Sequence, residues 1–325
     1  MISKDYSISF VRCIAMIFIV LCHVQQHYDI KLCWWFNVGV QIFFFISGWL
    51  YINKKFDSIK EILEFYFKNA VKILTNYYIY ITVVFIVLTY LNKVPEDYIN
   101  LYKITGVVPG LGHLWFIKYI LICYLITPIF VKIIEYFKKK NIIFILAIIV
   151  PIIVSILFKQ LHMIGAMINC FYFGMLLNSI KDDKHYYLII KICFLLAFVL
   201  NSIQLYVQYV LKLDIHTVKN LHYLQEYAHA FLGIVCFYIF KFIYSKINIS
   251  EKIKKILNYS DTYSYDVYLT HHIYILGPLS LFNGLEFSSL LLCKILFIIL
   301  ISAFVLNKIS CFVKKIIFKS YCFKA

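Results

Sequence analysis

The 325-residue sequence is poor in charged residues. Asp, Glu, Lys and Arg together make up 15% of the chain, whereas they make up about 25% of a soluble domain. Hydrophobic residues account for 63%, and a soluble globule of this length has too little interior to bury so much apolar surface. The composition therefore excludes a soluble domain, a disordered chain, a collagen-like repeat and a small disulfide scaffold. It predicts a polytopic membrane protein.

Acidic residues are scarce relative to basic ones. The chain has 16 Asp and Glu against 32 Lys and Arg, a formal net charge of +16. In a soluble protein this balance would favour a nucleic-acid partner, but no basic groove interleaved with aromatic residues is present. The positive residues stand in short blocks between apolar stretches, which is typical of cytoplasmic loops that face anionic headgroups. We therefore expect the lipid bilayer, and no nucleic acid, as a partner.

Paired cysteines are also absent. None of the ten cysteines forms a CxxC pair, and most lie inside apolar runs. We expect them to pack as small hydrophobic residues between helices, with no metal site. The first apolar stretch has no small-residue cleavage site, so we expect it to be a retained signal-anchor helix.

Ten apolar stretches approach the length of a membrane helix, which is about 20 residues. We therefore expect an all-α integral membrane protein with about ten transmembrane helices, forming a single polytopic domain over residues 1–325. The expected spans lie near residues 7–25, 36–53, 75–92, 114–134, 142–159, 163–180, 187–208, 226–245, 263–281 and 287–313.

The distribution of lysine predicts the orientation of these spans. If the N-terminus is cytoplasmic, the inner segments carry 22 lysines and the outer segments carry 6. The excess on one side predicts that both termini face the cytoplasm, as expected for a bacterial plasma-membrane protein. Segment 54–74, between the second and third spans, alternates apolar and charged residues. It predicts an amphipathic helix at the cytoplasmic headgroup surface.

The chain has one arginine, Arg12, and it lies inside the first predicted span. Placing Arg at the centre of a membrane helix costs about 2.5–3.5 kcal/mol even on the insertion scale. Every other basic residue of the chain is a lysine, so the arginine at this position indicates that a planar guanidinium is needed there. A guanidinium can bind a phosphate through two hydrogen bonds. The alternative is an arginine that snorkels to the inner headgroups.

His23 follows Arg12 by eleven residues on the same predicted helix. Eleven residues make about three turns, so the two side chains share a face and lie about 16 Å apart. A fixed cation and a titratable imidazole on one face suit a path for an elongated anionic substrate. The alternative for His23 is a hydrogen-bonded structural histidine.

Five short motifs occur in order along the predicted spans. They are RCIAMIFIVLCH from Arg12 to His23, Val38-Gly39-Val40-Gln41 followed by FFFISGWL with Ser47, His113-Leu114-Trp115-Phe116-Ile117 followed by Tyr124 and Pro128, Tyr172-Phe173-Gly174, and Ser264-Tyr265-Asp266-Val267-Tyr268-Leu269-Thr270-His271. Together they resemble the motifs of the membrane acyltransferase-3 family, which O-acylates sugars and other surface glycans. The resemblance extends from residue 12 to residue 271 and implies an acyltransferase with ten spans.

The resemblance implies acetyl-CoA, or another acyl-CoA, as co-substrate, with no bound cofactor and with a glycan or polysaccharide as acceptor. Arg12, Lys68 and Lys72 would then hold the phosphates of the donor, and His23 would be the general base or a transient acyl carrier. The chain departs from the family pattern at Ser9, where many members have Asp. It also departs at Lys68 and Lys72, where arginines are frequent.

Further polar and aromatic residues are candidates for binding the acceptor or supporting His23. Glu226, His229 and His113 are predicted at the outer level of the membrane, where they could meet His23. The alternative for Glu226 is an interfacial carboxylate in water, and the alternative for Tyr268 and His271 is hydrogen bonding between helices. The alternative for Trp115 is an aromatic residue of the membrane-interface belt. The full set of candidates is Ser47, His113, Trp115, Glu226, His229, Tyr268 and His271.

Two other classes of function remain open at this point. A transporter or flippase of a lipid-linked glycan would also be polytopic, but it should show internal repeats or helices broken by Gly and Pro. No repeat is visible, and the chain has 10 Gly and 5 Pro. A sensor or binding protein would tolerate the loss of His23. A measurement of acyl-CoA consumption distinguishes the acyltransferase from both alternatives, because neither a transporter nor a sensor consumes the thioester.

Overall fold

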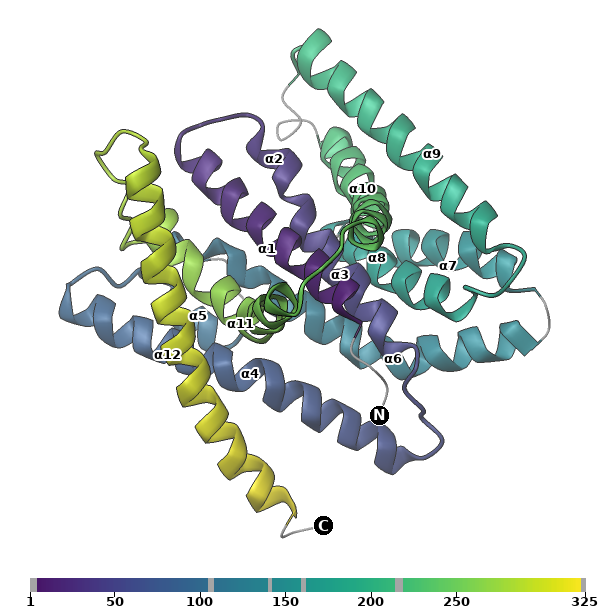
Figure 1. Ribbon diagram of the computed structural model, residues 1–325, viewed down its shortest axis with the longest axis horizontal. Coiled ribbons are helices and arrows are strands. Elements are labelled where there is room, and N and C mark those ends of the chain that lie inside the picture. Colours follow the sequence, from purple (N-terminus) through teal and green to yellow (C-terminus); the bar gives the residue numbers. More distant parts are fainter. Residues whose placement is uncertain (1–4, 105–107, 140–141, 159–161, 214–218, 323–325) are drawn as a thin grey trace. The chain divides into compact units, whose positions relative to one another are not determined.

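The computed structural model describes residues 5–104, 108–139, 142–158, 162–213 and 219–322 (Figure 1). Across these ranges the chain is helical and forms no strand, which confirms the predicted all-α architecture. The elements are α1 (Tyr6–His27), α2 (Cys33–Phe36), α3 (Val38–Tyr51), α4 (Ile59–Tyr90), α5 (Ile99–Tyr102), a 3₁₀ turn (Gly112–Leu114), α6 (Trp115–Lys139), α7 (Ile143–Leu157), α8 (His162–Ser179), α9 (Tyr186–Leu205), a π turn (Tyr206–Val210), α10 (Lys219–Lys246), α11 (Glu251–Ile275) and α12 (Ser289–Cys322).

Within the described residues, seven helical segments are long and apolar enough to cross a membrane. Two further apolar segments, Ile145–Leu157 and Ile164–Ser179, are shorter. The helix at the ninth predicted span, α11, is rich in Tyr, Ser, Asp and His and is not among the seven. The chain is thus a multi-pass membrane protein. The count of ten spans and the N-in, C-in orientation stay predictions, and Lys4, Lys140, Lys159 and Lys324 of the lysine count lie outside the described residues.

The predicted amphipathic helix between the second and third spans is not a separate element. Residues 59–90 form one helix, α4, of 32 residues. No Gly or Pro lies between the amphipathic part and the apolar part, so nothing ends the helix there. At 1.5 Å per residue α4 is about 48 Å long, which exceeds the hydrocarbon thickness of about 30 Å. Its polar first turns therefore extend beyond the apolar layer.

The chain divides into two compact units, and each unit draws on three separate segments. Unit 1 consists of Met1–Ile19, Trp34–Ser58 and Leu125–Leu257, and unit 2 of Val20–Cys33, Ile59–Tyr124 and Asn258–Ala325. Neither unit is a continuous stretch of sequence. The prediction of a single domain over residues 1–325 stays a prediction.

Unit 1 is organised around α3, α8 and α10, which pack against one another. A Cβ atom added at Gly48 would overlap the carbonyl oxygen of Phe171, and one added at Gly174 would overlap that of Phe45. The backbones of α3 and α8 are therefore in direct contact. Small residues at the contact are the usual means by which membrane helices approach so closely.

Unit 2 contains the packed pair α4 and α12, and polar side chains link both helices to α11. The buried carboxylate of Asp266 on α11 accepts hydrogen bonds from Asn76 of α4 and Asn307 of α12. The Asn307 Nδ2 to Asp266 Oδ2 distance is 2.7 Å. This buried polar network holds three helices of unit 2 together.

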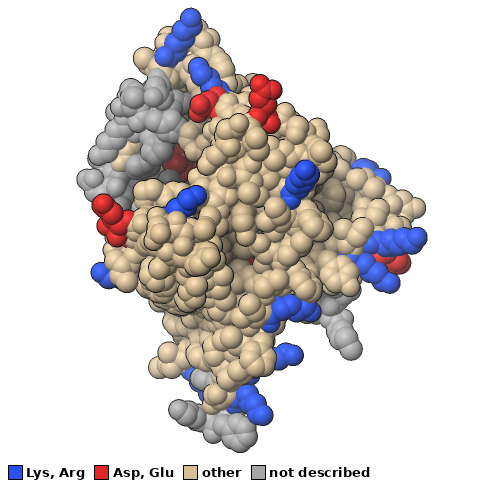
Figure 2. Space-filling view, turned by 90° about the vertical axis from the view of Figure 1, so that its left-hand side faces the viewer, with Lys and Arg blue, Asp and Glu red and all other residues tan. Residues whose placement is uncertain are grey.

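Exposed apolar side chains are abundant on the helices of the described chain. Figure 2 shows a face on which uncharged residues cover most of the surface, with comparatively few Lys and Arg. Large exposed residues such as Phe198 on α9 and Phe297 on α12 agree with surfaces that face lipid.

Candidate functional site

His23 lies near the C-terminal end of α1, which runs without a break from Tyr6 to His27. Arg12 is therefore on the same helix, about three turns earlier, as the sequence predicts. The half-buried His23 ring places Nδ1 3.1 Å from Oε1 of Gln26. Because an amide oxygen only accepts hydrogen bonds, this contact assigns the proton to Nδ1 and leaves a lone pair on Nε2.

Three further histidines of unit 2 surround His23. Its ring centroid lies 5.2 Å from that of His271 and 4.7 Å from that of His272. The ring of His113 stacks on His272 at 4.5 Å and lies 5.2 Å from His271. We call His23, His113, His271 and His272 the histidine cluster. It is drawn from α1, the 3₁₀ turn and α11.

Each buried histidine of the cluster donates one hydrogen bond to a backbone carbonyl. His113 Nε2 lies 3.1 Å from the Leu269 oxygen, His271 Nδ1 lies 2.7 Å from the Tyr268 oxygen, and His272 Nδ1 lies 2.9 Å from the Gly110 oxygen. The second nitrogen of each ring is then an acceptor. Within the described chain, His113 Nδ1 and His271 Nε2 are buried and have no hydrogen-bond partner. The cluster thus presents acceptor nitrogens and no free donor.

The loop before the 3₁₀ turn positions two members of the cluster. Gly110 has φ +75°, a conformation that favours glycine, and a Cβ there would lie 2.8 Å from Pro278 Cδ. This close approach lets the Gly110 carbonyl accept the His272 hydrogen bond. It also brings His113 against α11. Gly110 of the PGLGHL segment is therefore required by the site itself.

Tyr268 supports the cluster as a positioning residue. Its buried hydroxyl donates to the backbone carbonyl of His113, and its ring lies 5.4 Å from the His113 ring and 5.0 Å from Phe116. Of the predicted candidates, the structure thus brings together His23, His113, Tyr268 and His271. Trp115 is half-buried beside Tyr119, with ring centroids 5.1 Å apart.

Two residues of the site were not singled out from the sequence. His272 follows His271 directly and lies one helix turn after Tyr268, and it was not among the candidates expected from the sequence. Asp266 was part of a quoted motif without a role of its own. A histidine pair and a carboxylate on one expected span were the signals that could have identified both.

The remaining predicted site residues of unit 1 lie on α1, α3 and α10. Arg12 and Ser47 are half-buried. Glu226 and His229 are buried, and the His229 ring lies 5.8 Å from that of Trp35. His229 Nε2 has no hydrogen-bond partner within the described residues. A meeting of Glu226 and His229 with His23 stays a prediction.

Lys68 and Lys72 lie one turn apart on the exposed, polar part of α4 in unit 2. Lys68 Nζ lies 2.9 Å from Glu64 Oε2. A phosphate that binds Lys68 would therefore compete with an existing ion pair. Because the pair is exposed, it adds little stability and gives way at little cost.

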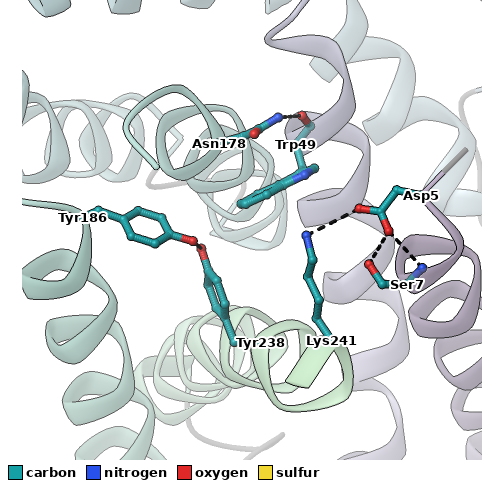
Figure 3. A network of polar contacts seen from close by, with 7 residues as sticks. All are labelled: Asp5, Ser7, Trp49, Asn178, Tyr186, Tyr238 and Lys241. Carbon is teal, nitrogen blue, oxygen red and sulfur yellow. Dashed lines mark hydrogen bonds and ion pairs between the residues drawn. The ribbon is translucent and has the colours of Figure 1, made fainter. Parts of the chain in front are cut away.

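A second polar network lies in unit 1 at the start of α1 (Figure 3). Asp5 accepts a hydrogen bond from the backbone N–H of Ser7 at 2.9 Å, which caps the helix, and its Oδ2 lies 3.5 Å from Lys241 Nζ. Lys241 also lies 5.1 Å from the centre of the Trp49 ring. Burial raises the pKa of Asp5, but the Ser7 hydrogen bonds and the Lys241 charge outweigh it, so the pKa is lowered. This network ties α1 to α10 and α3.

No three His, Cys, Asp or Glu side chains of the described ranges converge as metal ligands. Because each buried ring of the cluster donates one N–H to a carbonyl, the chemistry that it offers is that of an imidazole with a free lone pair. A neutral imidazole with a free lone pair accepts a proton from a hydroxyl group or attacks an acyl group itself.

Comparison with known protein families gives a match over most of the chain. A family model described as an acyltransferase domain matches residues 5–308. The matched range includes Arg12, Asp266 and every member of the histidine cluster. Comparisons with curated proteins and with solved structures returned no match.

Proposed function

The chain belongs to the acyltransferase-3 family, and from this we propose that it transfers an acyl group from cytoplasmic acyl-CoA to a hydroxyl group of a surface or exported glycan. Acetyl-CoA is the donor we expect. The family establishes an acyltransferase in the membrane. The donor, the acceptor and the roles of individual residues are the content of the proposal.

The observation that carries the proposal is the state of His23 inside the histidine cluster. Its Nδ1 is engaged by Gln26, so its Nε2 keeps a lone pair. In the proposed step the acceptor hydroxyl gives its proton to His23 Nε2 while its oxygen attacks the thioester carbonyl carbon. The carbon–sulfur bond then breaks, and the CoA thiolate leaves and takes up a proton. His23 thus acts as general base.

The neighbouring histidines keep His23 suited to this role. Ring centroids at 4.7 and 5.2 Å mean that two charged rings would repel each other strongly. The neutral form of the cluster is therefore favoured before transfer, and a base must be neutral to accept a proton. After transfer, the acceptor nitrogens of His271 and His272 lie close to the newly charged ring.

Arg12 is the proposed contact for the donor phosphates. It is the single arginine of the chain, it is half-buried on α1, and a guanidinium binds phosphate through two parallel hydrogen bonds. Lys68 and Lys72 would contribute point charges. The pantetheine arm of CoA is long enough for the phosphates to lie at Arg12 while the thioester reaches His23, several turns away on α1.

The decisive experiment measures release of the CoA thiol by the purified full-length protein with a glycan acceptor. The wild-type protein should consume acetyl-CoA, whereas a transporter or a sensor would not. His23→Gln keeps the size and hydrogen bonding of the side chain but cannot take a proton at neutral pH. We expect its rate to fall about 10²- to 10⁴-fold, the usual contribution of a general base. A near-normal rate in this variant would contradict base catalysis by His23.

Donor binding is tested separately with Arg12→Lys. Loss of the two-point phosphate contact should weaken acyl-CoA binding by about 1–3 kcal/mol. Lys118, an exposed residue of α6, provides the matched control as Lys118→Arg and should leave donor affinity unchanged. Wild-type affinity in Arg12→Lys would identify Arg12 as a structural or snorkelling residue. Trapping of an acylated protein in the absence of acceptor would instead assign His23 as a transient acyl carrier.

A further inference from the structure

A pocket of about 310 Å³ lies within unit 1 between α7, α8 and α10. Its volume is at the lower end of the range of ligand pockets, which is about 300–1,000 Å³. Most of its wall is apolar or aromatic, including Phe173 of α8 and Phe231 of α10. No residue of the histidine cluster lines it. The proposed transfer step assigns no role to this pocket.

Three polar side chains form one connected group in the wall of this pocket. The Tyr227 hydroxyl donates to Ser155 Oγ at 2.8 Å, and Ser155 Oγ donates to the Pro151 carbonyl at 2.7 Å. Asn169 Nδ2 lies 3.2 Å from Ser155 Oγ and 3.3 Å from the Pro151 oxygen. The hydroxyl hydrogens of Ser155 and Tyr227 are thus both used inside the wall.

The contacts of Asn169 determine which of its atoms remains free. Its Nδ2 must face the Pro151 carbonyl, because a carbonyl accepts and does not donate. The amide oxygen, Oδ1, then points away from that carbonyl. Asn169 is 4% exposed, it lines the pocket, and its Oδ1 has no hydrogen-bond partner within the described residues. A buried acceptor without a partner is rare and is normally matched by water or a ligand.

The mouth of the pocket opens among lipid-facing side chains. Ile152 and Ile156 of α7 line the pocket and are 52% and 67% exposed. On an apolar helix of a membrane protein such exposed isoleucines contact acyl chains. A ligand that enters by this route must dissolve in the bilayer.

We propose that this pocket binds a membrane lipid through a hydroxyl group. The apolar walls receive the aliphatic part of the lipid, and its hydroxyl donates a hydrogen bond to Asn169 Oδ1. The Tyr227 oxygen, whose hydrogen is already used, offers a second acceptor. Because the wall offers acceptors and no free donor, a lipid whose polar end only accepts, such as an ether or an ester, does not satisfy Asn169.

The test compares two photoactivatable probes on the full-length protein in lipid nanodiscs. One is hexadecanol with a mid-chain diazirine, and the other is its methyl ether, which has the same chain and lacks the donor. Mass spectrometry of peptides from α7, α8 and α10 should show about tenfold more labelling by the alcohol, the effect of a hydrogen bond to a buried acceptor. Equal labelling by both probes would mean that the pocket holds ordinary annular lipid and does not recognise the hydroxyl group. If neither probe labels the pocket, it holds water and no lipid. Equal labelling and absent labelling would each overturn the proposal.

Asn169→Leu should remove the preference for the alcohol over the ether. The matched control is Asn178→Leu on the same helix, whose Nδ2 donates to the Trp49 carbonyl outside the pocket. It should keep the preference within about twofold. If Asn169→Leu does not fold, Tyr227→Phe removes one acceptor and should reduce the preference severalfold. An unchanged preference in the folded variants would contradict the assignment of the site.

Discussion

The helices inside unit 1 and the helices inside unit 2 are held together by different kinds of contact. In unit 1, α3 and α8 meet at glycines, and a methyl group at Gly48 or Gly174 would overlap a backbone carbonyl. In unit 2, α11 is bound to its neighbours by buried polar groups, among them Asp266 and the histidine cluster. One unit therefore depends on the absence of side-chain volume, and the other on the presence of particular hydrogen-bond partners.

This difference indicates where chemistry can be placed. A glycine contact leaves no room for a reactive group, but it gives a rigid frame. A buried polar group is costly in a membrane unless it has partners, so such groups mark functional positions. The histidine cluster, with acceptor nitrogens that lack partners, has the character of an active site. The Asp266 network, in which both carboxylate oxygens accept hydrogen bonds, has the character of a structural support.

The largest expected effect concerns the histidines of the two units. His271→Gln and His113→Gln should each lower the acyl-transfer rate at least about tenfold, because they remove an acceptor nitrogen next to His23. His185→Gln in unit 1, at the residue before α9, should stay within about twofold of the wild-type rate. The rates are compared in the CoA-release assay at saturating donor. A larger loss in His185→Gln than in His271→Gln would contradict a role of the histidine cluster in the transfer.

The glycine contacts of unit 1 predict the next effect. Gly48→Ala should lower the free energy of unfolding by about 1–3 kcal/mol, the usual cost of overpacking, since its Cβ meets backbone that cannot move aside. Leu50→Ala, at an exposed position of the same helix, should cost much less. Denaturant titration in mixed micelles measures both variants. Equal stability of the two would show that α3 and α8 do not pack at the glycine.

The Asp266 network predicts a comparable or smaller loss. Asp266→Asn places a third amide against the Asn76 and Asn307 amides, so one acceptor is lost, and we expect about 1–3 kcal/mol of destabilisation. Asn307→Ala should cost less. The two changes should not be additive, because they share one hydrogen bond. Strictly additive values in a double-mutant cycle would argue against the contact between the two side chains.

The smallest effect is the pH dependence of the Asp5–Lys241 pair. The pKa of Asp5 is lowered from its ordinary value of 3.8 when the protein folds. The pair therefore stabilises the protein above that value, and this contribution is lost as the pH falls through the lower folded-state pKa. Because both side chains are partly exposed, we expect a few tenths of a kcal/mol. The free energy of unfolding is measured between pH 3 and 6 for both proteins, and Asp5→Asn should lack this pH-dependent contribution. A pH profile of Asp5→Asn identical to that of the wild type would exclude a contribution of the Asp5–Lys241 pair.

The parts of the molecule that sequence predicts well are those that depend on neighbouring residues. Each predicted span overlaps a helix, although the ninth, residues 263–281, extends past the end of α11 at Ile275. An apolar layer requires the backbone hydrogen bonds to be made within the segment, so a long apolar run forms a helix even where it contains Pro128 or Pro151. The continuous helix α1 from Tyr6 to His27 places Arg12 and His23 as their spacing predicts. Most of segment 54–74 is helical, as predicted, but it is the first part of α4, because no helix breaker separates it from the apolar part.

The partners of His23 depend on contacts between distant segments. His113 and Leu269 are 156 residues apart, and His272 and Gly110 are 162 residues apart, yet each pair shares a hydrogen bond. Spacing along one helix carries no information about which neighbouring helix a side chain will meet. The sequence thus suggested that His113 could meet His23, but it did not join His271 to them, and it gave His272 no role.

The sequence by itself determined the helical membrane architecture, the family and the pairing of Arg12 with His23 on one helix. These follow from composition, from apolar run lengths and from the regular rise of a helix, which are local properties. The tertiary structure alone decided which imidazoles surround His23, which two asparagines donate hydrogen bonds to Asp266, and that Asn169 lines a pocket with an unpaired oxygen. The reason is physical: a buried polar atom is satisfied or left free by groups that other helices bring to it, and only packing selects those groups.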